Sequence, residues 1–239
     1  MSLQLDALCI DAREPRRLAD FWGALLGWGS DDHRGGVAVL RPSDDTGFSI
    51  RLLPTIEPKV SQNLMHFDLT SRSDEGQQQT VARALELGAQ PIDVGQRPEE
   101  GHVVLADPEG NEFCVIEAGN QFLADCGFIG AVACDGSQAV GYFWSAALEW
   151  PLVWDQDEET AIRSPAGGPK ITWGGPPLMT RTGKNRLHFD VRPSPGDDPL
   201  AEVERLLALG ATSIEARSES GGILLADPDG NEFRVVSPH

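Results

Sequence analysis

The feature that most constrains this chain is that it carries one sequence pattern twice. Three segments of the first half return in the same order in the second half, at a nearly constant interval. A repeated unit of about 120 residues is too long for a solenoid and indicates a duplicated domain. The paired segments are RRLADFWGALLGW (16–28) with QAVGYFWSAALEW (138–150), MHFDLT (65–70) with LHFDVR (187–192), and LADPEGNEF (105–113) with LADPDGNEF (225–233).

A polar, glycine-bearing stretch, EAGNQFLADCGF (117–128), separates the two copies and suits a domain boundary. We therefore expect two domains, residues 1–119 and residues 125–239. The chain of 239 residues is long enough for two domains of ordinary size, each with a substantial core.

Each unit is predicted to contain two β-α-β-β-β modules. In the first module, Leu18, Phe21 and Trp22 recur at the spacing of one helical face. Pro15 and Gly27 mark the expected start and end of that helix. The DPEGN and DPDGN segments favour tight turns between two strands. These elements predict the α+β class, with curved sheets that carry their helices on one face.

The composition narrows the range of partners and compartments. A formal net charge of −18 argues against nucleic acid and anionic membranes, because both repel an acidic surface. No apolar run of about 18 residues is present, so no membrane span is expected, and the N-terminal segment shows no secretion signal. Four cysteines without a CxxC pair are typical of a reduced compartment, so we expect a cytoplasmic protein.

The repeated histidines lie on strands whose residues alternate between apolar and polar. In the first copy, Phe67 and Leu69 would face the helices, which turns His66 and Asp68 to the opposite face. If such strands line a concave sheet, each unit forms a cup with a few convergent polar groups, as small-molecule sites do. The alternative is that this face is only solvated or packed between the units. The polar sets are His66, Asp68, Glu112 and Cys114 in the first unit, and Arg186, His188, Asp190, Glu232 and Arg234 in the second.

Taken together, the motifs resemble the glyoxalase-like branch of the vicinal oxygen chelate superfamily, which also holds bleomycin-resistance proteins and extradiol dioxygenases. The resemblance rests on FWGALLGW, HFDL, ELGA and ADPEGNEF, and on FWSAALEW, HFDV, ALGA and ADPDGNEF, and it covers nearly the whole chain. It implies paired βαβββ modules whose sheets curl into cups. It leaves open whether the modules pair within each unit or across the two units.

Metal-dependent members of that superfamily hold a divalent ion through ligands on the first and last strands of the modules. His66 and His188 match the histidine position, but the other positions carry no carboxylate. The resemblance therefore implies no catalytic metal, with zinc at His66 and Cys114 the least disfavoured because nitrogen and sulfur ligands suit it. The substituted positions are Ala7 and Ile129 on first strands, and Cys114, Arg234, Ser49 or Arg51, and Lys170 or Thr172 on last strands.

These considerations predict a metal-free protein that binds a small organic ligand in a cup, as antibiotic- or metabolite-sequestering proteins do. The alternative is a lyase, isomerase or dioxygenase-like enzyme of the superfamily that acts through His66, with or without a divalent metal. His66 would then be a base and Cys114 a nucleophile, although Asp68, about 7 Å along the strand, need not touch the ring. The predicted ligand-binding residues are Arg51, His66, Asp68, Glu112, Cys114, Trp173, His188, Asp190 and Arg234.

The expected ligand and assembly follow from weaker signals. The acidic balance favours a cationic ligand through long-range attraction. Trp173, on a strand expected to line a cup, favours an aromatic ligand, whereas Trp22 and Trp144 are predicted to pack in the core. One unit could also be a degenerate structural partner, in a monomeric pseudo-dimer or in a homodimer.

Overall fold

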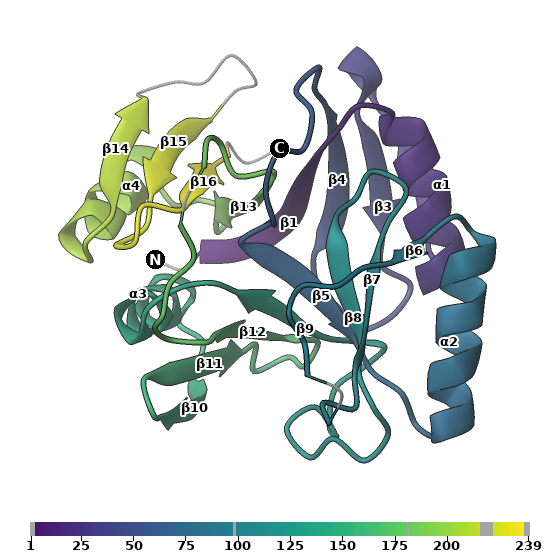
Figure 1. Ribbon diagram of the computed structural model, residues 1–239. Coiled ribbons are helices and arrows are strands. Elements are labelled where there is room, and N and C mark those ends of the chain that lie inside the picture. The colour runs from purple at the N-terminus through teal and green to yellow at the C-terminus, as the bar shows by residue number, and fades with distance from the viewer. Residues whose placement is uncertain (1–2, 98, 181, 216–221, 237–239) are drawn as a thin grey trace.

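The computed structural model describes residues 3–97, 99–180, 182–215 and 222–236. Within these residues the chain forms two eight-stranded mixed sheets and four α-helices, so the predicted α+β class is confirmed (Figure 1). No described helix is long and apolar enough to cross a membrane. The helices are α1 (Pro15–Leu26), α2 (Asp74–Glu86), α3 (Gln138–Leu148) and α4 (Pro199–Ala208), with one short 3-10 turn, η1 (Arg34–Gly36).

The strands follow the order that the duplication predicts, with each module contributing one helix and several strands. The first unit contains β1 (Leu3–Ala12), β2 (Gly29–Asp32), β3 (Ala38–Arg41), β4 (Ser49–Pro54), β5 (Met65–Leu69), β6 (Gln90–Pro91), β7 (Val103–Ala106) and β8 (Glu112–Val115). The second unit contains β9 (Ile129–Cys134), β10 (Leu152–Gln156), β11 (Glu159–Arg163), β12 (Lys170–Trp173), β13 (Leu187–Pro193), β14 (Thr212–Glu215), β15 (Ile223–Ala226) and β16 (Glu232–Val235).

The sheets pair modules across the two units, which answers the question that the resemblance left open. The first sheet has the order β14-β15-β16-β13-β1-β4-β3-β2 and joins the first module to the last. The second has the order β10-β11-β12-β9-β5-β8-β7-β6 and joins the two middle modules. The units meet where β1 runs antiparallel to β13 and where β5 runs antiparallel to β9. Each cup therefore takes strands from both units, and the expectation of one cup per unit is wrong.

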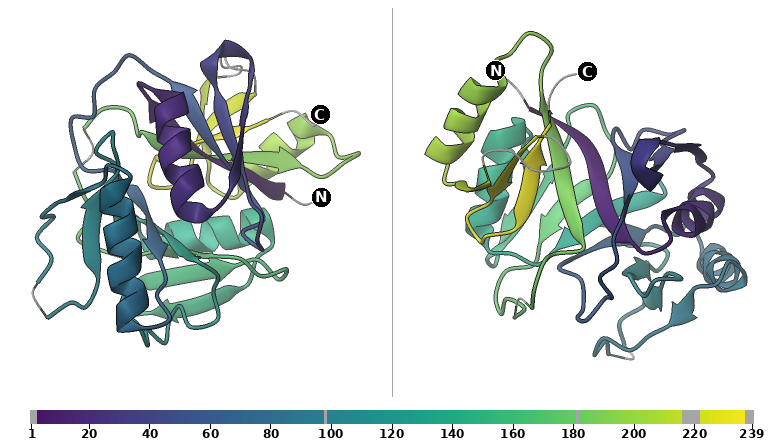
Figure 2. Two further views of the ribbon diagram at one scale, coloured as in Figure 1. Left: turned by 90° about the vertical axis from the view of Figure 1, so that its right-hand side faces the viewer. Right: turned by 90° about the horizontal axis from the view of Figure 1, so that it is seen from above.

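The helices pack mainly against strands of their own unit, although α3 also contacts β1 of the first unit. Helices α1 and α2 lie on one flank of the molecule and α3 and α4 on the other (Figures 1 and 2). The Trp22 ring on α1 lies 5.2 Å from the ring of Phe67 and 5.1 Å from that of Phe113, which confirms that it packs in the core. Its Nε1 donates to buried Asp107 at 3.1 Å. The repeated motifs are therefore the pieces of one shared core.

The second unit repeats these contacts residue for residue. Trp144 lies 5.4 Å from Phe189 and 4.9 Å from Phe233, and its Nε1 donates to Asp227 at 3.3 Å. The two aspartates begin the repeated turns, where each also accepts from the backbone and side chain of the following asparagine. The predicted helix end is confirmed at Gly27, whose φ of 73° is a conformation that glycine adopts without strain.

Candidate functional site

The face of each sheet that is turned away from the core presents the alternating polar residues. We call this face cup A on the first sheet, around β1, β4, β13 and β16. We call it cup B on the second sheet, around β5, β8, β9 and β12. The two cups carry equivalent histidines, His188 on β13 and His66 on β5.

Cup A is built around the carboxylate of Asp190, which is fully buried. Arg234 on β16 donates to it twice, from Nε at 2.9 Å and from Nη2 at 2.6 Å. Arg51 on β4 donates to the same carboxylate at 2.8 Å and also pairs with Asp6. Arg192 forms a further ion pair with Asp6. Two carboxylates thus hold three guanidinium groups side by side.

The residues beneath this network are uncharged apart from Asp190. Burial lowers the pKa of His188 to about 4, because Arg234 nearby opposes a second positive charge and the pull of Asp190 does not compensate. Burial raises the pKa of the Cys9 thiol well above its ordinary value. Burial alone would raise the pKa of Asp190, but the bonds and charge of Arg234 hold it below its ordinary value. His188 and Cys9 are therefore an uncharged imidazole and an uncharged thiol, and they lie next to Asp190, which is bound by Arg234.

A cavity of about 1130 Å³ opens above the arginines. Arg51, Arg192 and Arg234 line it together with Asp6, whereas His188 and Asp190 do not, because they lie below the arginines. These two residues were predicted to bind a ligand; they lie on the predicted face of the strand, but beneath the arginines that line the cavity. Apolar residues line other parts of the same cavity, among them Val37, Val39, Phe48, Leu53 and Trp150.

Two members of this site, Asp6 and Arg192, were not predicted from the sequence. Arg192 follows His188 and Asp190 at the same two-residue interval, so strand alternation contains the signal for it. Asp6 gives no such signal. A β-bulge between Leu5 and Ala7 breaks the alternation of β1 and turns Asp6 toward the arginines.

Cup B contains a different cluster around His66. Its Nε2 lies 3.4 Å from Oδ1 of Asp68, so this aspartate does reach the ring, contrary to what strand spacing suggests. Cys114 on β8 completes a group in which one ligand atom from each residue lies within 4.8 Å of the others. Burial lowers the pKa of His66, but hydrogen bonds with Asp68 and Cys114 outweigh it and raise the pKa to about 10. His66 is therefore an imidazolium at neutral pH, opposite in charge state to His188.

The stretch predicted as a domain boundary lies against cup B. Leu123 is buried and forms an apolar cluster with Cys114 and Ala131 of the cup. Lys170 on β12 donates to the backbone oxygen of Phe122, and its Nζ lies 4.4 Å from the centre of that ring. The linker therefore fills part of this cup and leaves it less open than cup A.

Two of the predicted ligand-binding residues have other roles. Trp173 is 2% exposed and points into the core, so the prediction that it lines a cup is wrong. Glu112 is buried and accepts from Lys59 and from the backbone nitrogen of Asn63, which anchors the segment that joins β4 to β5. Ile129 likewise faces the core rather than a metal position.

The two cups differ in how well they fit the divalent metal that the superfamily implies. In cup A, Cys9, His188 and Asp190 are close enough to share an ion, but Arg51 and Arg234 already occupy the aspartate, and their charge repels a cation. A metal does not fit there. In cup B, the nitrogen, oxygen and sulfur donors suit zinc in number and type, although the proton on His66 competes with the ion.

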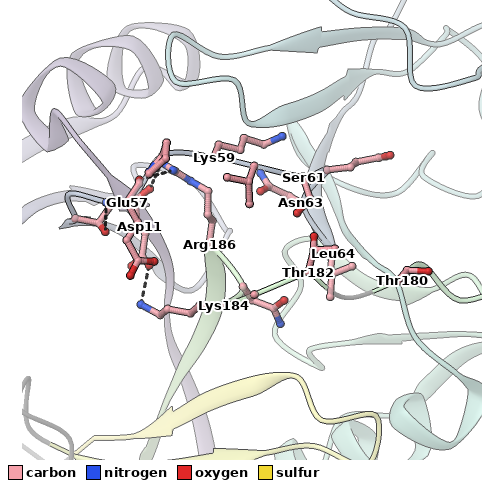
Figure 3. A pocket seen from close by; sticks show the side chains of 16 residues that line it. Asp11, Glu57, Lys59, Ser61, Asn63, Leu64, Thr180, Thr182, Lys184 and Arg186 are labelled. Carbon is pink, nitrogen blue, oxygen red and sulfur yellow. Dashed lines mark hydrogen bonds and ion pairs between the residues drawn. The ribbon is translucent and has the colours of Figure 1, made fainter.

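A smaller pocket of about 240 Å³ lies between the two segments that connect modules, lined by residues of 55–64 on one side and by Thr180 and residues 182–186 on the other (Figure 3). Lys184 binds buried Asp11 across it at 2.7 Å, and Arg186 at its edge binds Glu109 at 2.9 Å. This pocket was not predicted, because it forms only when both connecting segments cross between the sheets.

Comparison with known proteins agrees with the architecture. The sequence profile of the glyoxalase-like domain matches residues 7–116 and again residues 130–236. Comparison with curated protein sequences gives no match. Glyoxalase I from Zea mays has the same fold, with a TM-score of 0.65 at 14% identity over 99% of this chain and 92% of that one. A glutamate-to-glutamine mutant of that enzyme gives a TM-score of 0.66 at 15% identity, over 99% and 94% of the two chains.

At these identities the likeness to solved structures establishes the fold alone. The profile matches most of the chain, once in each copy of the repeat. With two curved sheets and the repeated motifs in one core, this protein belongs to the glyoxalase-like domain family of the vicinal oxygen chelate superfamily, as a tandem duplication.

Proposed function

We propose that the protein binds a small organic molecule in cup A and that this binding needs no metal, as in sequestration of an antibiotic or metabolite. The observation that carries the proposal is the cavity of about 1130 Å³ above Arg51, Arg192 and Arg234. Pockets of roughly 300–1,000 Å³ with a few convergent polar groups and apolar walls are typical of small-ligand sites. The guanidinium groups are held in place by Asp6 and Asp190, so they are preorganised for a ligand.

Cup A is favoured over cup B because of the linker. Leu123 and Phe122 occupy space against the face of cup B. A ligand there would have to displace the buried Leu123 side chain, which would cost roughly 1.5–3 kcal/mol to return to water, and the half-buried Phe122 ring as well. A ligand that binds in cup A does not have to displace the linker.

The test is to screen the full chain against a small-molecule collection by thermal shift and to confirm hits by calorimetry. Val37→Trp places a large ring on the cavity wall, because Val37 is half-buried there. We expect this substitution to abolish binding of genuine hits. Val153→Trp, on exposed β10 of the other sheet, is the matched control and should leave binding intact. Hits that survive Val37→Trp contradict the proposal.

A second candidate function is an enzyme that acts through His66. The observation that favours it is the contact of His66, Asp68 and Cys114 within 4.8 Å, since three protein ligands are what a catalytic zinc site holds. A bound zinc would supply a Lewis acid there. Elemental analysis after purification tests this candidate. One equivalent of zinc, lost in Cys114→Ser and retained in Cys126→Ser, would support it, and sub-stoichiometric metal in both would count against it.

A further inference from the structure

The floor of cup A carries an excess of positive charge. Three guanidinium groups, those of Arg51, Arg192 and Arg234, share two carboxylates, those of Asp6 and Asp190. The chain as a whole has a formal net charge of −18, so this floor is opposite in sign to the net charge of the chain. Charges beyond about 8–10 Å are largely screened at physiological ionic strength. The local groups therefore decide which ligand charge the cavity accepts.

The three arginines differ in exposure and in the number of bonds that they make to carboxylates. Arg234 is 8% exposed and is bound by two of its nitrogens to Asp190. Arg192 is 30% exposed, and among the described residues its ion pair is with Asp6 alone. Arg51 is 20% exposed and is bound by one nitrogen to Asp6 and by another to Asp190. A guanidinium has five N–H groups, so Arg192 keeps donors for a ligand while Asp6 fixes its position.

The apolar lining of the cavity favours a ligand with an apolar body. Val37, Val39 and Leu53 line it on the side of β3 and β4. A ligand with an anionic end and a flat apolar body would place its charge on the arginines and bury its body against these residues. Planar carboxylates match a guanidinium with two parallel hydrogen bonds, which a spherical cation or a neutral amide cannot reproduce.

We infer that cup A is a site for organic anions, with Arg192 and Arg51 binding the carboxylate of a ligand whose apolar body lies against Val37, Val39 and Leu53. This inference rests on the proposed function and adds the charge class of the ligand. It replaces the cationic ligand that the acidic composition suggested. It also assigns a role to Arg234, which holds Asp190 and so prevents that carboxylate from repelling the ligand.

The test uses three probes of one shape that differ in charge: 2-naphthoate, 2-naphthamide and 2-naphthylmethylamine. Their affinities for the full chain are measured by calorimetry at physiological ionic strength. We expect 2-naphthoate to bind at least about tenfold more tightly than the amide, because its carboxylate carries a charge opposite to that of arginine and accepts two parallel hydrogen bonds, whereas the amide has one acceptor oxygen and no charge. The amine should bind most weakly. Equal affinities, tighter binding of the amine, or binding of none of the three overturns the inference.

Variants of Arg192 test whether its guanidinium contacts the carboxylate of the ligand. Arg192→Gln should weaken 2-naphthoate at least about tenfold and weaken the amide much less, since it removes the guanidinium that pairs with the charge of the carboxylate. Arg192→Lys keeps the charge and guards against misfolding of the glutamine variant. It should restore part of the affinity. Arg16→Gln, at a 69% exposed arginine paired with Asp32, is the matched control and should change nothing. Unchanged 2-naphthoate binding in folded Arg192→Gln overturns the inference.

The two proposals fail separately. If neutral or cationic hits from the screen are blocked by Val37→Trp, cup A is a ligand site and only the charge class is wrong. If no hit responds to Val37→Trp, the proposed function itself fails.

Discussion

Cups A and B are built from the same repeated strand, yet they hold its histidine in opposite charge states. The pKa of His188 is lowered to about 4, whereas that of His66 is raised to about 10. Both histidines stand two residues before an aspartate, and both face away from the core. The difference lies in the last strand of the module, where cup A has Arg234 and cup B has Cys114.

The residue at this position, Arg234 or Cys114, determines which group binds the aspartate. Arg234 takes both oxygens of Asp190, so His188 is left buried beside a cation and stays neutral. In cup B no arginine is hydrogen-bonded to Asp68 among the described residues, and its carboxylate stabilises the His66 imidazolium instead. The same repeated motif can therefore hold a neutral imidazole beside arginines in one cup and a cationic imidazole in the other.

The sharpest test of this comparison removes the arginine. Arg234→Ala leaves Asp190 buried with only the Arg51 bond, and breaking a buried ion pair typically costs about 3–5 kcal/mol. We expect the free energy of unfolding, measured by urea denaturation at pH 7, to fall by this amount. The equivalent substitution in cup B, Cys114→Ala, removes a small thiol with no ion pair to an acid and should cost far less. Similar losses in both variants would contradict the assignment.

The second prediction concerns acid stability. Between pH 6.5 and about 4 the unfolded chain takes up a proton at His188 that the folded protein does not, so the free energy of unfolding must fall as the pH falls. The full effect is roughly 3 kcal/mol. His188→Gln cannot titrate, and its stability should decline less over this window. Parallel wild-type and His188→Gln curves would show that the folded histidine is not shifted.

The third prediction concerns the opposite histidine. Because the pKa of His66 is raised in the folded protein, its stabilising contribution is fully present below pH 6.5 and is lost as the pH rises toward 10. NMR titration of the metal-free protein should find His66 still protonated at pH 8 while His188 is neutral at pH 5.5. Asp68→Asn should lower the pKa of His66 by about 1 to 3 pH units. If both rings titrate near 6.5, the comparison fails.

Strand alternation and the repeat predicted most of this architecture. The faces of β5, β8, β13 and β16 were correctly assigned, and the helix over Phe21 and Trp22 ends at Gly27 as expected. The pairing of modules across units could not be predicted, because β1 and β5 offer equivalent edges to β9 and β13. Bulges also defeat alternation, as at Asp6, whose position depends on the register of neighbouring strands.

The linker shows a further limit, since its polar composition suggested an open boundary. One of its charged residues, Asp125, is 62% exposed and pairs with Lys170 on β12 at 3.3 Å and with Arg163 on β11. Exposed ion pairs contribute about 0.2–1 kcal/mol. Asp125→Asn should therefore cost less than about 1 kcal/mol, and less still in high salt.

The informative measurement for this last variant is hydrogen exchange, because it detects local opening of the linker that the global free energy of unfolding does not report. Amides of residues 117–128 should exchange faster in Asp125→Asn, while those of β1, β4 and β13 in cup A keep their rates. Leu123 remains buried against Cys114 in this variant, so the linker should loosen without leaving the cup. Unchanged exchange would mean that Leu123 alone holds the linker. Faster exchange in both cups would mean that the two sites are coupled, and the difference between them could no longer be assigned to local neighbours.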